Sequence, residues 1–194
     1  MRRLHDLAER SGHCYKVKLM LSFLGLGYER IEVDRRRGDN RTPEFLALSA
    51  RGLVPVLEDD GETIWDSQAI LAYLGARYGS PDWWPESPGQ IAQVMQWMAV
   101  AQGEIQLGLQ RARAIKRTGR AGSLEEAQQI GARALLLLDG QLARQPWLAL
   151  GRPTVADVAC YPYVALAPEG GVSLTPYSAV RGWLASFESL PGYV

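Results

Sequence analysis

A serine, a histidine and a cysteine lie close together near the start of the chain, in residues 11–14 (S-G-H-C). This segment separates a short strand predicted at residues 4–7 from a run with apolar residues at helical spacing, so we expect it at a strand-to-helix turn. Backbone N–H groups at a helix N-terminus attract anions. Ser11 and Cys14 have the spacing of a redox Cys-x-x-Cys pair, but serine replaces the first cysteine. Because one thiol cannot carry out dithiol exchange, the segment predicts a site that holds the thiol of another molecule.

A second chemical feature is the tripeptide Leu53-Val54-Pro55 at the entry to an apolar run. A proline there removes one hydrogen-bond donor from a sheet, and such prolines occur on edge strands or, in the cis form, in tight turns. If Val54 exposes its backbone N–H and C=O beside the thiol site, a peptide-like ligand could pair with it as an added strand. An ordinary edge-strand proline is the alternative, and this feature alone favours neither.

A third feature is Asp66-Ser67 in front of a helical pattern. A serine at this place is commonly a helix cap. The same helix start could instead bind a ligand carboxylate through the Ser67 hydroxyl and N–H, while Asp66 could bind an ammonium group. Together the three features describe a ligand with a thiol, a central amide backbone and a terminal amino-carboxylate, which is the layout of glutathione.

The elements that must position these residues change in type near residue 80. Residues 1–79 predict the order βαβαββα, in which the βαβ half forms a parallel pair and the ββ half an antiparallel hairpin around Asp60-Gly61. This is a thioredoxin-like plan. Residues 80–89 are dense in Gly, Pro and Ser and predict a linker. Residues 90–194 predict an all-α domain: a long amphipathic helix over 91–109, a second helix over 124–142 that ends at Gln145-Pro146, and two more that begin at Thr154 and Thr175-Pro176.

Composition excludes several classes of function. The 194 residues carry 21 acidic and 21 basic side chains, whereas a nucleic-acid-binding protein usually has a basic excess. No apolar run reaches the roughly 18 residues of a membrane span, and the charged N-terminus lacks the apolar core of a signal peptide. Two cysteines are too few for a disulfide framework. We therefore expect a cytoplasmic protein without a metal, a nucleic-acid partner or a membrane partner.

The chain resembles the glutathione S-transferase superfamily, specifically its cytosolic, bacterial-type members with a serine at the active site. The matching strings are S-G-H-C-Y-K-V-K-L-M-L, G-L-V-P-V-L-E-D-D-G, W-D-S-Q-A-I-L-A-Y-L and, in the helical part, P-T-V-A-D-V-A. The resemblance implies a transferase that uses glutathione as a substrate, acts in detoxification and forms a homodimer.

The resemblance also implies roles for individual residues. Ser11 matches the serine that donates a hydrogen bond to the glutathione sulfur, although a plain helix cap is the alternative. Leu53, Val54 and Pro55 match the segment that pairs with the cysteinyl part, and Asp66 and Ser67 match the γ-glutamyl clamp. Relatives often carry a polar residue at Leu53, which here offers only apolar contact.

His13 matches a position where close relatives often carry Asn. It could help to hold the sulfur or could face solvent. Asn40 and Arg41 stand where relatives often hold the glycine carboxylate. Cys160 reads as a buried small apolar residue, and Thr154 with Asp157 reads as a capping box.

A hydrogen bond from Ser11 together with the helix N-terminus is sufficient for the chemistry that the resemblance implies. A free thiol has a pKa of about 8.5, and lowering it by about two units requires about 2.7 kcal/mol. A hydrogen bond to a charged group supplies roughly 1.5–3 kcal/mol, and a helix N-terminus adds about 0.3–1 kcal/mol. No charged base is needed.

The second substrate is less well defined by the sequence. A small hydrophobic electrophile is expected in a pocket between the domains that faces the long helix, with Trp97, Met98 and Gln102 as candidate contacts. Alternative functions on the same fold are glutathione-dependent isomerisation, dehalogenation or disulfide reduction. A non-catalytic protein that only binds glutathione or another ligand is a further alternative.

Overall fold

The computed structural model describes residues 1–7 and 11–194, and the chain divides into two compact units. The first unit contains Met1–Gly79 together with Gly192–Val194, and the second contains Ser80–Pro191. The expected division into 1–79, 80–89 and 90–194 did not foresee that the last three residues group with the first unit. They do so because the Ser22 hydroxyl of the first unit donates to the Gly192 carbonyl at 2.6 Å.

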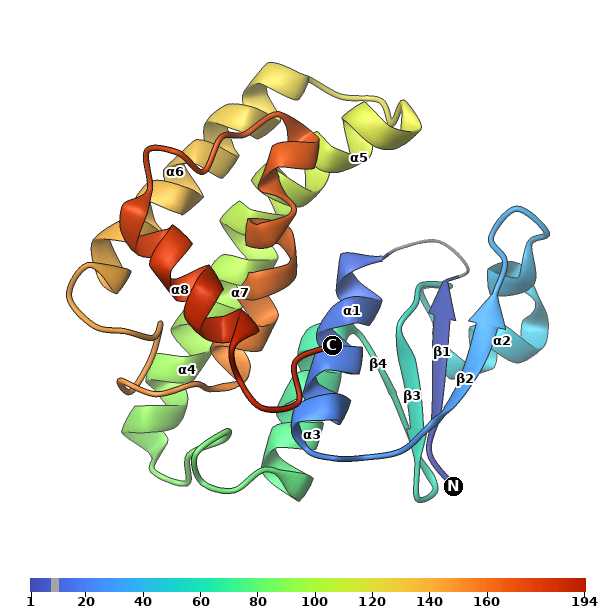
Figure 1. The fold of residues 1–194 in the computed structure, drawn as a ribbon. Coiled ribbons are helices and arrows are strands. Elements are labelled where there is room, and N and C mark those ends of the chain that lie inside the picture. Colours follow the sequence, from blue (N-terminus) through green and yellow to red (C-terminus); the bar gives the residue numbers. More distant parts are fainter. Residues whose placement is uncertain (8–10) are drawn as a thin grey trace. The chain divides into compact units, whose positions relative to one another are not determined.

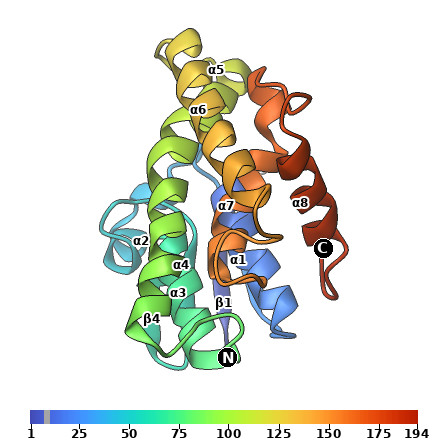
Figure 2. The same cartoon turned by 90° about the vertical axis from the view of Figure 1, so that its left-hand side faces the viewer.

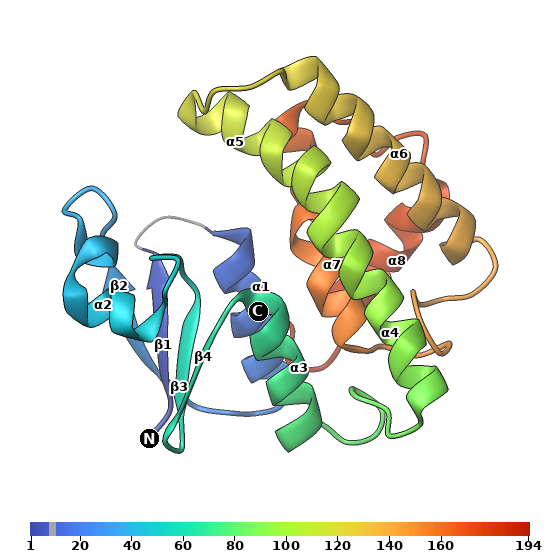
Figure 3. The same cartoon turned by 180° about the vertical axis from the view of Figure 1, so that it is seen from behind.

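The first unit is built on a four-stranded sheet in the order β2-β1-β3-β4. Strand β1 pairs in parallel with β2 and antiparallel with β3, and β3 pairs antiparallel with β4. The helices α1 and α3 lie on one face of the sheet, and α2 lies on the other (Figures 1 and 3). The predicted βαβαββα order is therefore confirmed. The bounds are β1 (Arg3–Leu7), α1 (Gly12–Phe23), β2 (Glu29–Val33), η1 (Asp39–Arg41), α2 (Pro43–Leu48), β3 (Val56–Asp59), β4 (Glu62–Trp65) and α3 (Ser67–Tyr78).

Local sequence explains where these elements start and turn. Thr42 caps α2 by accepting a hydrogen bond from the Phe45 N–H at 3.2 Å, and Pro43 follows at the first helical position. Asp60 and Gly61 both have positive φ, 53° and 86°, as the tight turn of a β3–β4 hairpin requires. The antiparallel hairpin predicted around these two residues is confirmed.

The loop that leads into β3 is fixed by a close backbone approach at Gly52. Its φ is +60°, and a Cβ atom at this position would lie 2.7 Å from the Asn40 carbonyl oxygen. The Asn40 side-chain amide in turn donates to the Gly52 carbonyl at 2.8 Å. A side chain at Gly52 would displace the residues that follow it, which are the predicted ligand segment. Buried Asn40 therefore serves to hold this loop.

The second unit is all-helical, as predicted. Its bounds are α4 (Pro88–Val100), η2 (Ala101–Gln110), α5 (Arg111–Thr118), α6 (Leu124–Leu142), α7 (Val155–Ala165), η3 (Ala167–Gly170) and α8 (Ser178–Glu188). In Figure 2, α4 continues through η2 into α5, and α6 packs alongside these three consecutive helical elements. Within the described residues, no helix is long and apolar enough to cross a membrane.

The long helix expected over residues 91–109 is α-helical only in part, because η2 is a π-helix. Its buried residues are Ala101, Ile105, Gly108 and Leu109. They continue the apolar face of α4, so the predicted amphipathic pattern is present although the hydrogen bonding is that of a π-helix. The π-helix packs against α6 at Gly108, where an added Cβ atom would lie 2.3 Å from the Gly131 backbone nitrogen. Two backbones in direct contact explain why both positions are glycine.

Helix α6 spans Leu124–Leu142, the predicted range. The start of the last helix differs from the prediction. Helix α8 begins at Ser178 and not at Thr175-Pro176. Its first amides are bound by a side chain of another helix, since the Asp139 carboxylate of α6 accepts from the Ala179 and Val180 N–H groups at 2.9 and 3.0 Å. The predicted buried face of α8 is confirmed: Val180, Trp183, Leu184 and Phe187.

Candidate functional site

Ser11 lies at the N-terminus of α1, immediately after the residues outside the described ranges. Its Oγ accepts a hydrogen bond from the Cys14 N–H at 3.4 Å, so Ser11 does cap the helix. A hydroxyl has two acceptor lone pairs and one donor hydrogen. The cap therefore uses an acceptor site. The hydroxyl also forms a hydrogen bond with the Cys14 sulfur. Because a protonated thiol is only a weak acceptor, the hydroxyl hydrogen can turn from it to a ligand thiolate. The side chain is partly exposed, which allows such a ligand to reach it.

Cys14 is not available as a nucleophile. Its side chain is fully buried, and this burial raises the pKa of the thiol to about 12. The negative charge of the adjacent Asp6 carboxylate, with which the thiol is hydrogen-bonded, contributes to this rise in the pKa. Because the thiolate is the reactive form, this cysteine is inert at neutral pH. A reaction at this site must use the thiol of a bound molecule.

His13 reaches across to the other helix of the site. Its Nδ1 lies 3.3 Å from the Ser67 Oγ, so the imidazole joins the N-terminal turn of α1 to that of α3. The sequence predicts either the ligand sulfur or solvent as the neighbour of His13, and it does not indicate the contact with Ser67. Burial lowers the pKa of His13 to about 3, and the nearby positive charges of Lys16 and Arg51 act in the same direction. The ring is therefore neutral at physiological pH.

The depressed pKa of His13 predicts a pH-dependent stability. Between about pH 6.5 and 3 the unfolded chain binds a proton at His13 that the folded chain does not bind. The free energy of unfolding must then fall as the pH is lowered through this window. From pH 7 to pH 5 we expect His13 to account for a loss of roughly 1–2 kcal/mol. Urea unfolding of the wild type and of His13→Asn at both pH values measures this difference; equal pH dependence in the two proteins would refute it.

The side chain of Ser49 fixes the backbone at the start of the predicted ligand segment, residues 53–55. The Ser49 hydroxyl donates to the Leu53 carbonyl at 3.0 Å and accepts from the Leu53 N–H at 3.2 Å. The peptide bond between Val54 and Pro55 is cis. The Leu53 side chain is 42% exposed, in keeping with an apolar contact to a ligand. The whole segment leads directly into β3.

Asp66, and not Ser67, is the residue that caps the N-terminus of α3. Asp66 is the N-cap of α3, because its Oδ1 accepts from the Gln68 N–H at 2.9 Å. Ser67 is the first helical residue, is 3% exposed and makes the contact to His13. The interpretation of Ser67 as the cap is thus wrong, and a carboxylate is the better cap because the helix dipole favours negative charge. Asp66 has φ +77°, a rare conformation for a residue with a side chain that is often found at functional sites.

Three further polar residues belong to this part of the first unit, and no motif in the sequence marked them. Arg51 forms an ion pair with Asp66, with 3.7 Å between Nη1 and Oδ2. Gln68 is only 8% exposed, and within the described residues neither atom of its side-chain amide has a hydrogen-bond partner. Lys16 is completely buried. Gln68 lies on the buried face of α3, and Lys16 lies on that of α1. A polar residue at a position that the helical periodicity assigns to the apolar face is the sequence signal for both.

The candidate contacts for a second substrate lie in the second unit. Trp97 and Met98 belong to α4, and Gln102 belongs to η2. Met98 is 3% exposed and packs in the core, whereas Trp97 is half-buried and Gln102 is exposed. The thiol of Cys160 on α7 lies 3.5 Å from the Trp97 carbonyl oxygen. Cys160 is buried, as expected.

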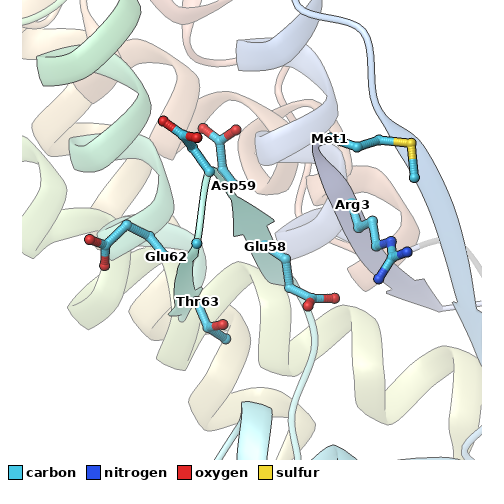
Figure 4. Close-up of a pocket in the computed structure, with 8 residues that line it drawn as sticks. Met1, Arg3, Glu58, Asp59, Glu62 and Thr63 are labelled. Atoms are coloured by element: carbon cyan, nitrogen blue, oxygen red, sulfur yellow. The ribbon is translucent and has the colours of Figure 1, made fainter.

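A separate hollow of about 280 Å³ lies at the β3–β4 hairpin (Figure 4). It is lined mainly by acidic residues and by Arg3, at the end of β1 opposite to the end that leads toward Ser11. Asp59 in its wall is already bound by Arg2, Tyr73 and Tyr78. This hollow is not part of the thiol site. Among the described residues, no group of three or more His, Cys, Asp or Glu side chains is arranged to hold a metal ion.

Comparisons with known proteins match both units. Residues 10–77 match the family model described as glutathione S-transferase, N-terminal domain, and residues 121–186 match that of the C-terminal domain. The chain is 33% identical to the glutathione S-transferase GstB of Escherichia coli over 91% of this chain and 88% of that protein. It is 32% identical to a maleylacetoacetate isomerase of Pseudomonas aeruginosa over 89% of this chain and 84% of that protein. A crystal structure of a glutathione S-transferase from Pseudomonas fluorescens superimposes with a TM-score of 0.91 and 36% identity, covering 100% of this chain and 97% of that one.

Proposed function

The chain belongs to the glutathione S-transferase family, and from that premise we propose that it is a glutathione transferase. In this proposal it binds glutathione and lowers the pKa of its thiol, and the resulting thiolate attacks a small hydrophobic electrophile. The relatives named as glutathione S-transferases support the proposal. We further propose, from the family resemblance, that it is a cytoplasmic homodimer that acts in detoxification.

The observation in this chain that best supports the proposal is the environment of Ser11. Ser11 presents a partly exposed hydroxyl at a helix N-terminus, and its only neighbouring thiol in the described residues, that of Cys14, is buried and fully protonated at neutral pH. A donor hydrogen bond and a helix dipole both stabilise a thiolate. The arrangement can activate a sulfur brought by a ligand and cannot use one of its own.

The remaining site residues have roles that fit glutathione. The backbone of Val54 would pair with the cysteinyl residue, with Leu53 and the cis Pro55 on either side of it. The Ser67 hydroxyl and the N-terminus of α3 would bind the γ-glutamyl carboxylate. Asp66 would bind the γ-glutamyl ammonium group, for which it must exchange its ion pair with Arg51. The Arg51 side chain is 57% exposed, so it can turn toward solvent when the ligand binds.

Conjugation of glutathione to 1-chloro-2,4-dinitrobenzene tests the proposal. The thiolate sulfur forms a bond to the ring carbon that carries chlorine, and chloride leaves with the bonding pair. We expect a rate that rises in proportion to protein concentration and saturates with glutathione. Calorimetric binding of glutathione without any turnover would instead indicate the non-catalytic alternative. Absence of both binding and turnover would refute the proposal.

Isomerisation is the second candidate, and the similarity to the maleylacetoacetate isomerase favours it specifically. A glutathione thiolate activated by Ser11 would serve this reaction as well. Cis–trans isomerisation of maleylacetoacetate, followed by ultraviolet absorbance with and without glutathione, distinguishes it from conjugation. Disulfide reduction through Cys14 is disfavoured, because this thiol is buried and has a pKa of about 12.

A further inference from the structure

The contact between His13 and Ser67 bridges the two helix starts that would hold the thiol and the γ-glutamyl end of the ligand. Ser11 and His13 lie in the first turn of α1, and Ser67 is the first residue of α3. The imidazole Nδ1 and the hydroxyl Oγ are 3.3 Å apart, a distance at which one of them donates a hydrogen to the other. Ser67 is 97% buried, so few other groups can reach its hydroxyl.

The direction of this hydrogen bond decides what Ser67 can do. A neutral imidazole has one N–H donor and one acceptor nitrogen, and a hydroxyl has one hydrogen and two lone pairs. If Ser67 donates to Nδ1, it offers only lone pairs to a ligand and repels a carboxylate. If Nδ1–H donates to Ser67, the hydroxyl hydrogen is left for the carboxylate. A carboxylate is an acceptor only, and so the second arrangement is the one compatible with it.

We propose that His13 is a positioning residue, whose Nδ1–H donates to Ser67 Oγ and thereby directs the Ser67 hydroxyl hydrogen to the γ-glutamyl carboxylate of glutathione. This inference rests on the proposed function and adds to it the residue that sets the hydrogen-bond direction in the carboxylate subsite. It assigns His13 to the γ-glutamyl end of the ligand and not to the sulfur. The neutral state of the ring is consistent with this role, because the positive charges of Lys16 and Arg51 oppose its protonation.

Two substitutions separate the two ring nitrogens. The side-chain amide of Asn places an N–H near the position of Nδ1, whereas that of Gln places it near Nε2. His13→Asn should therefore keep the donor to Ser67, and His13→Gln should lose it. By calorimetry we expect His13→Gln to weaken glutathione binding about tenfold, equivalent to about 1.4 kcal/mol. His13→Asn should stay within about threefold of the wild type.

Two further measurements exclude a merely structural role. Cysteinylglycine lacks the γ-glutamyl residue, so its binding should be the same in the wild type and in His13→Gln. In a double-mutant cycle, His13→Gln should have no additional effect in a Ser67→Ala background, since the group that it positions is absent. The pKa of the bound glutathione thiol, followed by ultraviolet absorbance, should not change in His13→Gln.

The outcomes distinguish this inference from the function on which it rests. Failure of the wild type to bind glutathione would overturn both. Glutathione binding by the wild type with equal affinity in His13→Gln would overturn the role of His13 alone, as would a full additional loss in the Ser67→Ala background. If His13→Gln does not fold, His13→Leu takes its place, and the cysteinylglycine measurement confirms that the variant retains an intact site.

Discussion

Replacement of Ser11 by alanine is expected to lower kcat/KM for conjugation between about 10- and 150-fold, the range that follows from a lost hydrogen bond of 1.5–3 kcal/mol to a charged group. The hydroxyl is partly exposed at the N-terminus of α1, and its cap contact to the Cys14 N–H uses only a lone pair. Its other neighbour, the protonated Cys14 sulfur, is a weak acceptor, so the hydroxyl hydrogen can be donated to a bound thiolate. Since the interaction forms with the thiolate, glutathione affinity should change less than the rate.

Ser11 has two functions in this account, and two controls separate them. Ser11→Ala also removes a helix cap, which costs about 1 kcal/mol of stability, whereas glycine at a cap costs only a few tenths. Ser11→Gly should therefore lose as much activity as Ser11→Ala while it stays nearly as stable as the wild type. Ser123 caps α6 by accepting from the Glu126 N–H at 3.1 Å, so Ser123→Ala is the matched control. It should lose stability and keep its activity.

Removal of the Asp157 carboxylate is expected to have the largest effect on stability. This fully buried carboxylate accepts hydrogen bonds from the Leu148 N–H, the Thr154 N–H and hydroxyl, and the Trp183 indole N–H at 3.0–3.2 Å. It thereby joins α7 to Thr154, which directly precedes this helix, to Leu148 in the α6–α7 connection, and to Trp183 of α8. Asp157→Ala would leave four buried donor groups without acceptors, and we expect a loss of about 3–5 kcal/mol in the free energy of unfolding.

Asparagine at position 157 provides a graded test of the same network. Burial raises the pKa of Asp157 to about 6 in spite of its hydrogen bonds, so a neutral side chain avoids the cost of a buried charge. The amide oxygen can still accept from Leu148 and Trp183, but the amide NH₂ would face the donors of Thr154. Asp157→Asn should therefore lie between the wild type and Asp157→Ala in urea unfolding. Equal stability of Asp157→Ala and the wild type would contradict the role of the network.

The fold was largely predictable because its signals are local. The Asp60-Gly61 turn and the Thr154–Asp157 capping box each depend on residues a few positions apart, and both appear as expected. The start of α8 was not predictable in this way. Its first amides are bound by Asp139, about 40 residues earlier in the chain. Thr175-Pro176 has the sequence of a helix start, but the helix begins at Ser178.

The site was predictable as a set of segments and not as a set of contacts. The strings around Ser11, Val54 and Ser67 predict three binding segments. The structure places Ser11 and Ser67 at the starts of α1 and α3, and Val54 before a cis peptide bond. The contact of His13 to Ser67 and the ion pair of Arg51 with Asp66 join residues that are distant in sequence. No periodicity or motif records such pairs, because they depend on how α1, α3 and the loop before β3 approach one another.

Titration of the thiol of enzyme-bound glutathione, followed by thiolate absorbance in the ultraviolet, tests the central claim most directly. In the wild type we expect a pKa about two units below the ordinary value of about 8.5, and in Ser11→Gly a return toward it by about one to two units. Ser123→Ala should titrate like the wild type. A bound thiol with the same lowered pKa in the wild type and in Ser11→Gly would contradict the claim that Ser11 activates glutathione.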